Sequence, residues 1–193
     1  MMLKVYNDGK LTSVLKKQNF LNIGVKFSCP RGKGLELEDT KPGKIILVAG
    51  GTGIFPFSDL IDLLFKTQMI EENHRMSEEL LYADPILKKS PFKNFNFVLL
   101  IAISEPEDLH PIFFAQLVRL SNNSEKIKIV MRVSKNVEAI KNDAGKIEFT
   151  RDYFTKRVVT EAQAKDFSRV WICGPPKMNT DTAKILEENG FRR

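Results

Sequence analysis

Short apolar runs alternate with amphipathic segments along the chain after residue 43. The runs at 45–49 and 95–103 lack polar alternation, which is typical of strands buried on both faces of a parallel sheet. Two further runs, at 126–133 and 168–173, are also predicted to be strands, and the alternation at the start of 126–133 indicates one wetter face.

Helical patterns follow three of these runs, at about 56–66, 105–120 and 177–189. Proline suits the first position of the first of these helices. The segment 151–164 is predicted to hold one or two short helices, whereas 146–149 is too short to assign. In the first helix, apolar side chains recur at the spacing of a stripe that faces a core: Phe57, Leu60, Ile61 and Leu64.

This alternation predicts a doubly wound α/β fold, in which helices cover both faces of a parallel sheet. Right-handed crossovers limit the topology, and we expect a strand order of about 3-2-1-4-5, with the fifth strand on the outside. The first and fourth strands would then be neighbours at the point where the winding reverses. Ligands of such sheets bind there, outside the carboxyl ends of the strands.

A glycine-rich turn, Gly50-Gly51-Thr52-Gly53, joins the first predicted strand to the helix expected to begin at Pro56. Glycine lets the backbone turn sharply and a ligand approach closely, while the helix directs unpaired N–H groups at the turn. These features favour a pyrophosphate or dinucleotide site; the alternative is a tight turn without a ligand. The spacing departs from G-x-G-x-x-G, and the absence of G-x-x-x-x-G-K-[ST] disfavours a phosphate-cleaving loop.

A second unusual turn, Cys-Gly-Pro-Pro at 173–176, follows the fourth predicted strand. In the expected topology both turns reach one crevice, which supports a ligand site more strongly than either turn alone. The alternative for Cys173 is a small buried thiol before a rigid turn. A nucleophilic cysteine needs a base and a metal needs several ligands, and neither His74 nor His110 lies in a sequence context that suggests one.

Composition limits the binding partners and the cellular compartments that are expected for this chain. The net charge of +6 comes without a basic stripe carrying aromatics, so no nucleic acid is expected, and a basic face for an acidic protein partner competes with an ordinary solvated surface. No run approaches the roughly 20 apolar residues of a transmembrane segment, and the N-terminus lacks a signal core. Two cysteines cannot form a disulfide framework. We expect a cytoplasmic protein, with a mitochondrial or membrane-peripheral location as the alternative.

The motifs AGGTGIFP at 49–56 and WICGPPKM at 171–178 resemble the nicotinamide-binding half of ferredoxin–NADP reductase-like flavoenzymes, and most closely the cytochrome b5 reductase branch. The resemblance implies that Thr52 and Cys173 lie beside the nicotinamide, where the thiol assists the geometry of hydride transfer. It also implies that NAD(P)H is bound by residues of both motifs: Gly50, Gly51, Thr52, Gly53, Ile54, Pro56, Cys173, Gly174, Pro175 and Met178.

Two domains are expected, a part of a flavin-binding barrel at 1–43 and a Rossmann-like NAD(P)-binding domain at 44–193. The first contains too few strand candidates to bury a core alone. The second is interrupted by a long polar insertion at about 67–94. The N-terminal residues are similar to the last part of the family's antiparallel flavin barrel. This similarity implies that a turn containing Gly9, Leu11 and Thr12 contacts the pyrophosphate of FAD.

The barrel's R-x-Y-[ST] motif is absent upstream of that turn, so we expect a fragment, a flavin half supplied by another chain, or a domain that is no longer catalytic. The function that the resemblance implies is hydride transfer from NAD(P)H to FAD, followed by electron transfer to a haem or iron–sulfur protein. The alternative is a non-catalytic interaction subunit that keeps the reductase fold and docks through the segment 67–94.

The turn after the third predicted strand bears on the choice of nicotinamide cofactor. A 2′-phosphate needs Arg, Lys or Ser there, and Ser134 and Lys135 could supply these groups; the alternative is an ordinary surface turn. The motifs as a whole are closer to the NADH-using branch, so NAD is favoured over NADP.

Overall fold

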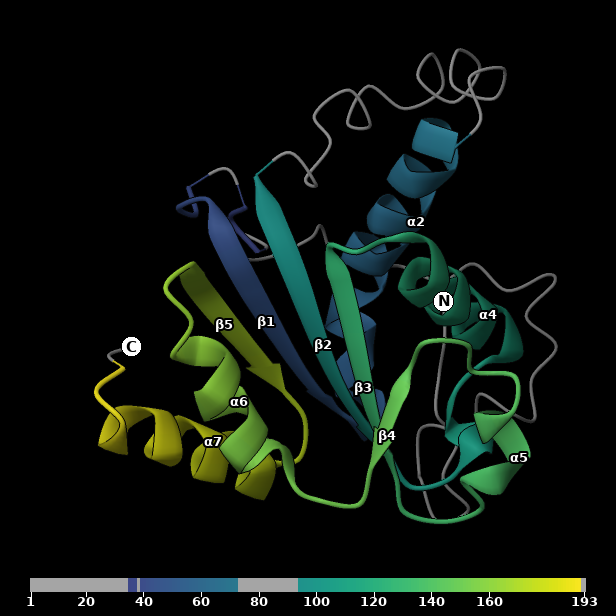
Figure 1. Ribbon diagram of the computed structural model, residues 1–193. Coiled ribbons are helices and arrows are strands. Elements are labelled where there is room, and N and C mark those ends of the chain that lie inside the picture. Colours follow the sequence, from purple (N-terminus) through teal and green to yellow (C-terminus); the bar gives the residue numbers. More distant parts are fainter. Residues whose placement is uncertain (1–34, 38, 73–93, 192–193) are drawn as a thin grey trace, which may run out of the picture. The chain divides into compact units, whose positions relative to one another are not determined.

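The computed structural model describes residues 35–37, 39–72 and 94–191 (Figure 1). Residues 1–40 and 41–193 form two compact units, and the architecture below is that of the second. The segment expected to resemble a flavin barrel lies almost wholly outside the described residues, so that expectation stays a prediction.

A five-stranded, all-parallel sheet forms the centre of the second unit, with the order β4-β3-β2-β1-β5. The four longer strands have the order expected from the sequence. The short strand β4 lies at the edge beside β3, in a segment whose three residues carry too little pattern to be assigned in advance. The strands are β1 (Gly43–Gly50), β2 (Phe95–Ile103), β3 (Ile127–Val133), β4 (Glu148–Thr150) and β5 (Phe167–Cys173).

Strand β1 is the middle of this sheet. Leu47 pairs with Leu99 of β2 on one side and with Trp171 of β5 on the other. The residues Ile45 to Ala49 are at most 1% exposed, which confirms the prediction of a strand covered on both faces. Burial of such side chains is the main favourable contribution to folding.

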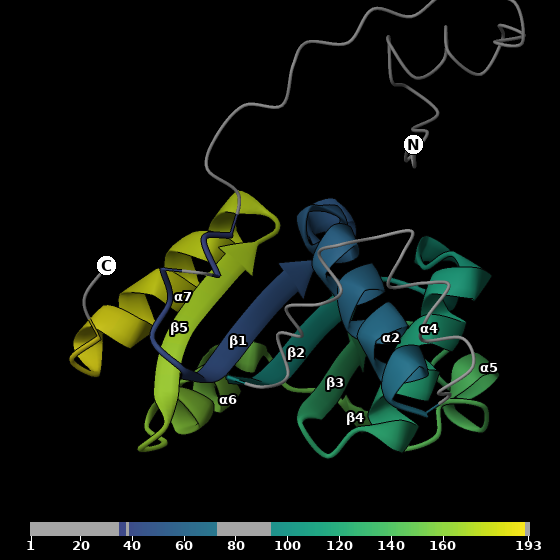
Figure 2. The ribbon, with the colours of Figure 1, turned by 90° about the horizontal axis from the view of Figure 1, so that it is seen from above.

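Helices cover both faces of the sheet, so the doubly wound α/β fold is confirmed (Figure 2). Helices α2 and α4 lie on one face, and α6 and α7 lie on the other. On the second face, Ile46 and Val48 of β1 share a core cluster with Val158 of α6 and Leu186 of α7. The helices are η2 (Gly51–Phe57), α2 (Ser58–Glu72), η5 (Pro106–Asp108), α4 (Pro111–Asn123), α5 (Glu138–Lys141), α6 (Phe154–Ala162) and α7 (Pro176–Glu188).

The first helix differs from its prediction at both ends. A 3₁₀ helix, with Pro56 inside it, replaces the expected loop, and the α-helix begins at Ser58. Proline has no N–H group for an α-helical hydrogen bond, and the Ser58 hydroxyl donates to the Phe55 carbonyl at 2.7 Å. The helix then continues to Glu72 because the polar residues Thr67 and Gln68 extend its buried stripe.

The second predicted helix, at about 105–120, also begins later than expected. Two prolines divide the segment, so the short helix η5 precedes α4, which begins at Pro111. His110 accepts a hydrogen bond at Nδ1 from the Ile112 N–H at 3.3 Å and thereby caps α4, which is a structural role. His74 lies outside the described residues. None of the helices in the described part of the chain is long and apolar enough to cross a membrane.

Candidate functional site

The two unusual turns of the sequence meet at the carboxyl edge of the sheet. Ala49 of β1 pairs with Cys173 of β5, so the turns that follow these strands start side by side (Figure 1). A Cβ atom placed on Gly53 would clash with the Cys173 carbonyl, and one on Gly174 would lie 3.0 Å from the Gly50 nitrogen. The expected convergence of the two turns is therefore found, and it depends on the absence of side chains at this junction.

Met178 occupies part of the same junction. A Cβ atom on Gly50 would lie 2.7 Å from the Met178 sulfur and 2.8 Å from Cδ of Pro175. A side chain on Gly174 would meet the Met178 methyl group. Close packing within the chain thus accounts for glycine at positions 50, 53 and 174 without a ligand, and Ile54 is buried behind the turn.

Gly51 differs from these three glycines. Its φ of +54° lies in the left-handed region that favours glycine, and a Cβ atom there would meet nothing within 4 Å. Thr52, the next residue, is exposed, as is Pro56 at the far end of the same 3₁₀ helix. The backbone at Gly51 and Thr52 is therefore open to an approaching group, at the helix end whose N–H groups attract anions.

Cys173 ends β5 with a half-exposed free thiol. Asn179, from the first turn of α7, donates a hydrogen bond from Nδ2 to the Gly174 carbonyl at 3.1 Å. Its N–H group donates to the Pro175 carbonyl at the same distance, 3.1 Å. Sequence reasoning missed Asn179, because an asparagine three residues into a helix gives no signal until the preceding turn is known. These bonds fix the turn that carries Cys173.

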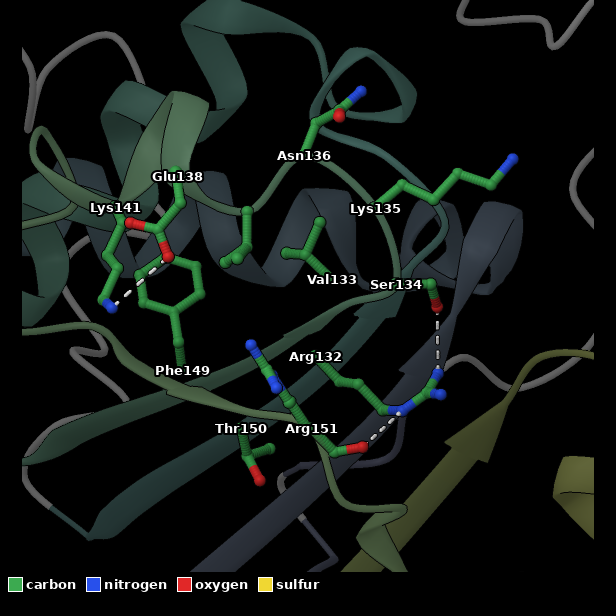
Figure 3. A pocket seen from close by; sticks show the side chains of 11 residues that line it. Arg132, Val133, Ser134, Lys135, Asn136, Glu138, Lys141, Phe149, Thr150 and Arg151 are labelled. Atoms are coloured by element: carbon green, nitrogen blue, oxygen red, sulfur yellow. Dashed lines mark hydrogen bonds and ion pairs between the residues drawn. The ribbon is translucent and has the colours of Figure 1, made fainter.

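A second hollow lies at the carboxyl ends of β3 and β4, two strands away from β1 (Figure 3). The cavity has a volume of about 510 Å³, and both Ser134 and Lys135 line it. Two backbone hydrogen bonds fasten their turn to the end of β2, from Ser134 N–H to the Ile103 carbonyl and from Lys135 N–H to the Ser104 carbonyl.

The cavity is strongly basic. Its lining includes the cations Arg132, Lys135, Lys141 and Arg151 and a single carboxylate, Glu138. Glu138 pairs with Lys141 at 3.6 Å. Among the described residues, no carboxylate forms an ion pair with the other three cations, so the cavity carries an excess of positive charge.

Arg132 is the most firmly held of these cations. Its Nε donates to the Arg151 carbonyl and its Nη1 to the Ser134 hydroxyl, both at 3.2 Å. Its guanidinium lies over the ring of Tyr153, 4.4 Å from the centroid. The sequence offered one signal for Arg132, a lone cation near the end of an apolar strand, and none for its contact with Tyr153.

The remaining sequence expectations for the site concern FAD. Gly9, Leu11 and Thr12 lie outside the described residues, so their contact with a flavin pyrophosphate stays a prediction. Among the described residues, no group of three or more His, Cys, Asp or Glu side chains is arranged to hold a metal ion.

A comparison with curated protein sequences found no match. Among solved structures, flavohemoglobin from Malassezia yamatoensis, determined with bound FAD and heme, is similar with a TM-score of 0.58 and 15% sequence identity. That match covers 99% of this chain, which spans only 40% of the flavohemoglobin chain. The family model of the oxidoreductase NAD-binding domain matches residues 47–184, and the chain therefore belongs to this family.

Proposed function

We propose that the chain binds NAD(P)H along the carboxyl edge of its sheet, as the nucleotide-binding half of a flavin-dependent oxidoreductase. The open left-handed backbone at Gly51 is the observation that carries this proposal. It stands at a helix N-terminus and at the strand pair β1–β5, where the winding of the sheet reverses. Doubly wound folds bind dinucleotides at such a point.

The distance between the two sites also suits a dinucleotide. Strand β2 separates β1 from β3, and neighbouring strands are about 4.8 Å apart, which puts roughly 10 Å between the two strand ends. With its pyrophosphate over Gly51 and Thr52, an extended dinucleotide would reach the basic cavity with its adenosine end. Its nicotinamide would then extend toward the turn of Cys173, Gly174 and Pro175.

The chemistry that bound NAD(P)H supplies is hydride donation, and this chain would orient and shield the nicotinamide. Thr52 and Cys173 come from the two turns that meet at the junction, and their exposed hydroxyl and half-exposed thiol suit contacts with a flat ring. Fixing the reacting ring is a large part of what a protein contributes to hydride transfer. Met178 would pack beneath the ring as an adaptable apolar side chain.

The hydride acceptor in this proposal is FAD, from which electrons pass to a haem or iron–sulfur protein. The similar flavohemoglobin contains FAD and heme, and this likeness of fold motivates the choice. Gly9, Leu11 and Thr12 would contact FAD from residues 1–43, while most of the flavin would be held by another protein segment or by a partner chain. The expected insertion would then begin after Glu72, where α2 ends, and belong to the nucleotide-binding domain at 44–193.

Titration calorimetry of the full chain with NADH and with NADPH tests the binding step. We expect measurable but weak binding of at least one of the two cofactors, and no reductase activity without a source of flavin. No heat of binding with either cofactor, at protein concentrations around 100 μM, a range that detects binding of roughly −5 kcal/mol or stronger, would overturn the proposal.

The packed junction supports a second candidate, a non-catalytic interaction subunit that keeps the reductase fold. Met178 and Pro175 already fill the space beside Gly50, as expected where no ring needs to enter. This candidate predicts that adding FAD and an artificial electron acceptor to the full chain gives no oxidation of NADH or NADPH. Turnover above that of free FAD would exclude it.

A further inference from the structure

We infer that Asn179 is a positioning residue, which holds the turn after β5 by the Gly174 carbonyl and thereby sets how the Cys173 thiol is presented. This inference rests on the proposed function, which gives the thiol its contact with the nicotinamide. It assigns a role to a side chain that belongs to neither of the two sequence motifs and to none of the expected cofactor contacts.

The peptide group between Gly174 and Pro175 has a single hydrogen-bonding group. Proline has no N–H, so this peptide offers only the Gly174 carbonyl, and glycine is the residue whose backbone rotates most freely. Any hydrogen bond that restrains this peptide must therefore go to that carbonyl. Asn179 makes such a bond, from Nδ2 at a distance of 3.1 Å.

The Asn179 side chain reaches a carbonyl that the backbone of α7 does not reach. The Asn179 N–H donates to the Pro175 carbonyl, four residues earlier, as is regular for an α-helix, and Gly174 lies one residue further back. Helix α7 has no side-chain cap at Pro175. The Asn179 amide therefore extends the hydrogen bonding of α7 into the turn, and it ties the turn to a helix that lies beside β5 (Figure 2).

The position of this turn matters for the thiol because the surrounding backbone is held. Strand β1 pairs with the Cys173 backbone, and a Cβ atom on Gly174 would lie only 3.0 Å from the Gly50 nitrogen. Rotation of the peptide after Gly174 is a movement that shifts the turn against the thiol without breaking the sheet. The bond from Asn179 opposes this rotation.

The other half of the Asn179 amide lowers stability rather than adding to it. Its Oδ1 atom is buried and has no hydrogen-bond partner among the described residues. A buried acceptor without a partner is unfavourable, and asparagine is also a weaker helix former than leucine. A function at the turn therefore explains asparagine at this position better than stability does.

Alkylation of Cys173 measures the presentation of the thiol directly. Cys29→Ser leaves Cys173 as the only cysteine of the full chain, and mass spectrometry follows its reaction with iodoacetamide at a fixed pH. In this background Asn179→Leu should raise the rate about threefold or more, because the released turn uncovers the half-exposed thiol. A rate that stays the same or falls would overturn the inference.

Urea unfolding separates this effect from a general loss of structure. The midpoint of Asn179→Leu should be unchanged or higher, since the buried Oδ1 atom is removed. A faster reaction together with a lower midpoint would be due to unfolding, and it would contradict a positioning role. Asn179→Gln keeps an amide donor on a longer side chain and should react more slowly than Asn179→Leu; equal rates would show that the donated bond has no part.

Asn189→Leu is the matched control on the same helix. The Asn189 amide also donates to a backbone carbonyl, that of Ile185 at 2.8 Å, but at the far end of α7. Its replacement should leave the alkylation rate within about twofold of that of the Cys29→Ser chain, because distant sites act independently. A reaction as fast as that of Asn179→Leu would contradict the assignment.

Addition of NADH or NADPH at a saturating concentration distinguishes the inference from the proposed function. Either cofactor that binds as proposed should slow the alkylation of Cys173 in the Cys29→Ser chain, because the nicotinamide would cover the thiol. A lack of protection by both would overturn the proposed contact between Cys173 and the nicotinamide. The rates without cofactor decide the role of Asn179 independently of that result.

Discussion

The carbonyl group of Cys173 stands where a side chain on Gly53 would have to be. This contact joins the turn after β1 to the end of β5, and it explains a glycine that phosphate binding alone would not require. The two halves of the proposed nicotinamide site are therefore held together by backbone packing. The stability of the domain and the geometry of the site depend on the same contact.

Gly53→Ala is accordingly expected to destabilise the domain by about 1–3 kcal/mol, since the added methyl group meets a backbone that cannot rotate away. Urea unfolding followed by circular dichroism measures the change. Thr52→Ala, at the exposed neighbouring position, is the control and should stay within about 0.5 kcal/mol. An unchanged midpoint in Gly53→Ala would show that the two turns are not packed as described.

Gly51 should behave in the opposite way, because its surroundings are open and only its φ of +54° demands glycine. Asparagine tolerates the left-handed region, so Gly51→Asn should cost less than about 1 kcal/mol of stability. Its side chain would nevertheless stand in the space proposed for the pyrophosphate, and the affinity for NAD(P)H should fall at least tenfold. Calorimetry alongside urea unfolding separates the two effects, and unchanged affinity would argue against a pyrophosphate at Gly51.

A third prediction is that Cys173 affects the orientation of the nicotinamide ring rather than the affinity for the cofactor. Cys173→Ala should leave the dissociation constant for the preferred cofactor within about threefold, because the thiol is one small group at the end of β5. The rate of cofactor oxidation with a supplied flavin partner should fall about tenfold, since a poorly oriented ring loses rate rather than affinity. A large loss of affinity with an unchanged rate would contradict this role.

The opposite edge of the sheet carries a group of charges centred on Glu161. Lys44 lies 3.3 Å and Lys128 lies 3.4 Å from its carboxylate. Arg157, which belongs to α6 like Glu161, also lies 3.4 Å from this carboxylate. Burial acts to raise the pKa of Glu161, but the combined attraction of Lys128 and Lys44 outweighs it, so its pKa is lowered from 4.5.

A lowered pKa means that the ionised form of Glu161 stabilises the folded state at neutral pH and that this contribution is lost as the pH falls through and below about 4.5. Glu161→Gln should therefore reduce the stability at pH 7 by about 1–2 kcal/mol and flatten the fall in stability on acidification. Urea unfolding between neutral and acidic pH measures both effects. A parallel pH profile for the two proteins would show that Glu161 contributes nothing to acid sensitivity.

The features of the fold that the sequence predicts are those that follow from hydrophobic periodicity and from the order of strands and helices. The runs within β1 and β2 predict buried strands because nearly every position is apolar, and alternation with helices then predicts the order of the longer strands. The meeting of the turns at 50–53 and 173–176 follows from that order. These features depend on periodicity and chain topology, which a sequence displays directly.

Other features depend on contacts that periodicity does not encode. The buried Thr67 and Gln68 lengthen α2, yet both read as polar residues of an insertion. Met178 fills the space beside Gly50, which becomes visible only when β5 lies next to β1. The stacking of Arg132 on Tyr153 joins the end of one strand to the start of a distant helix, and neither residue alone indicates its partner.

The pairing of β1 with β5 brings together the beginning and the end of the domain, because Ala49 pairs with Cys173 although β2, β3 and β4 lie between them in the sequence. The proposed nucleotide site cannot exist in a partly synthesised or partly folded chain, so a bound cofactor acts only on the completed sheet. By mass action it would then oppose the detachment of β5 and α7. The cofactor would thus stabilise the contact between the first and the last strand of the domain.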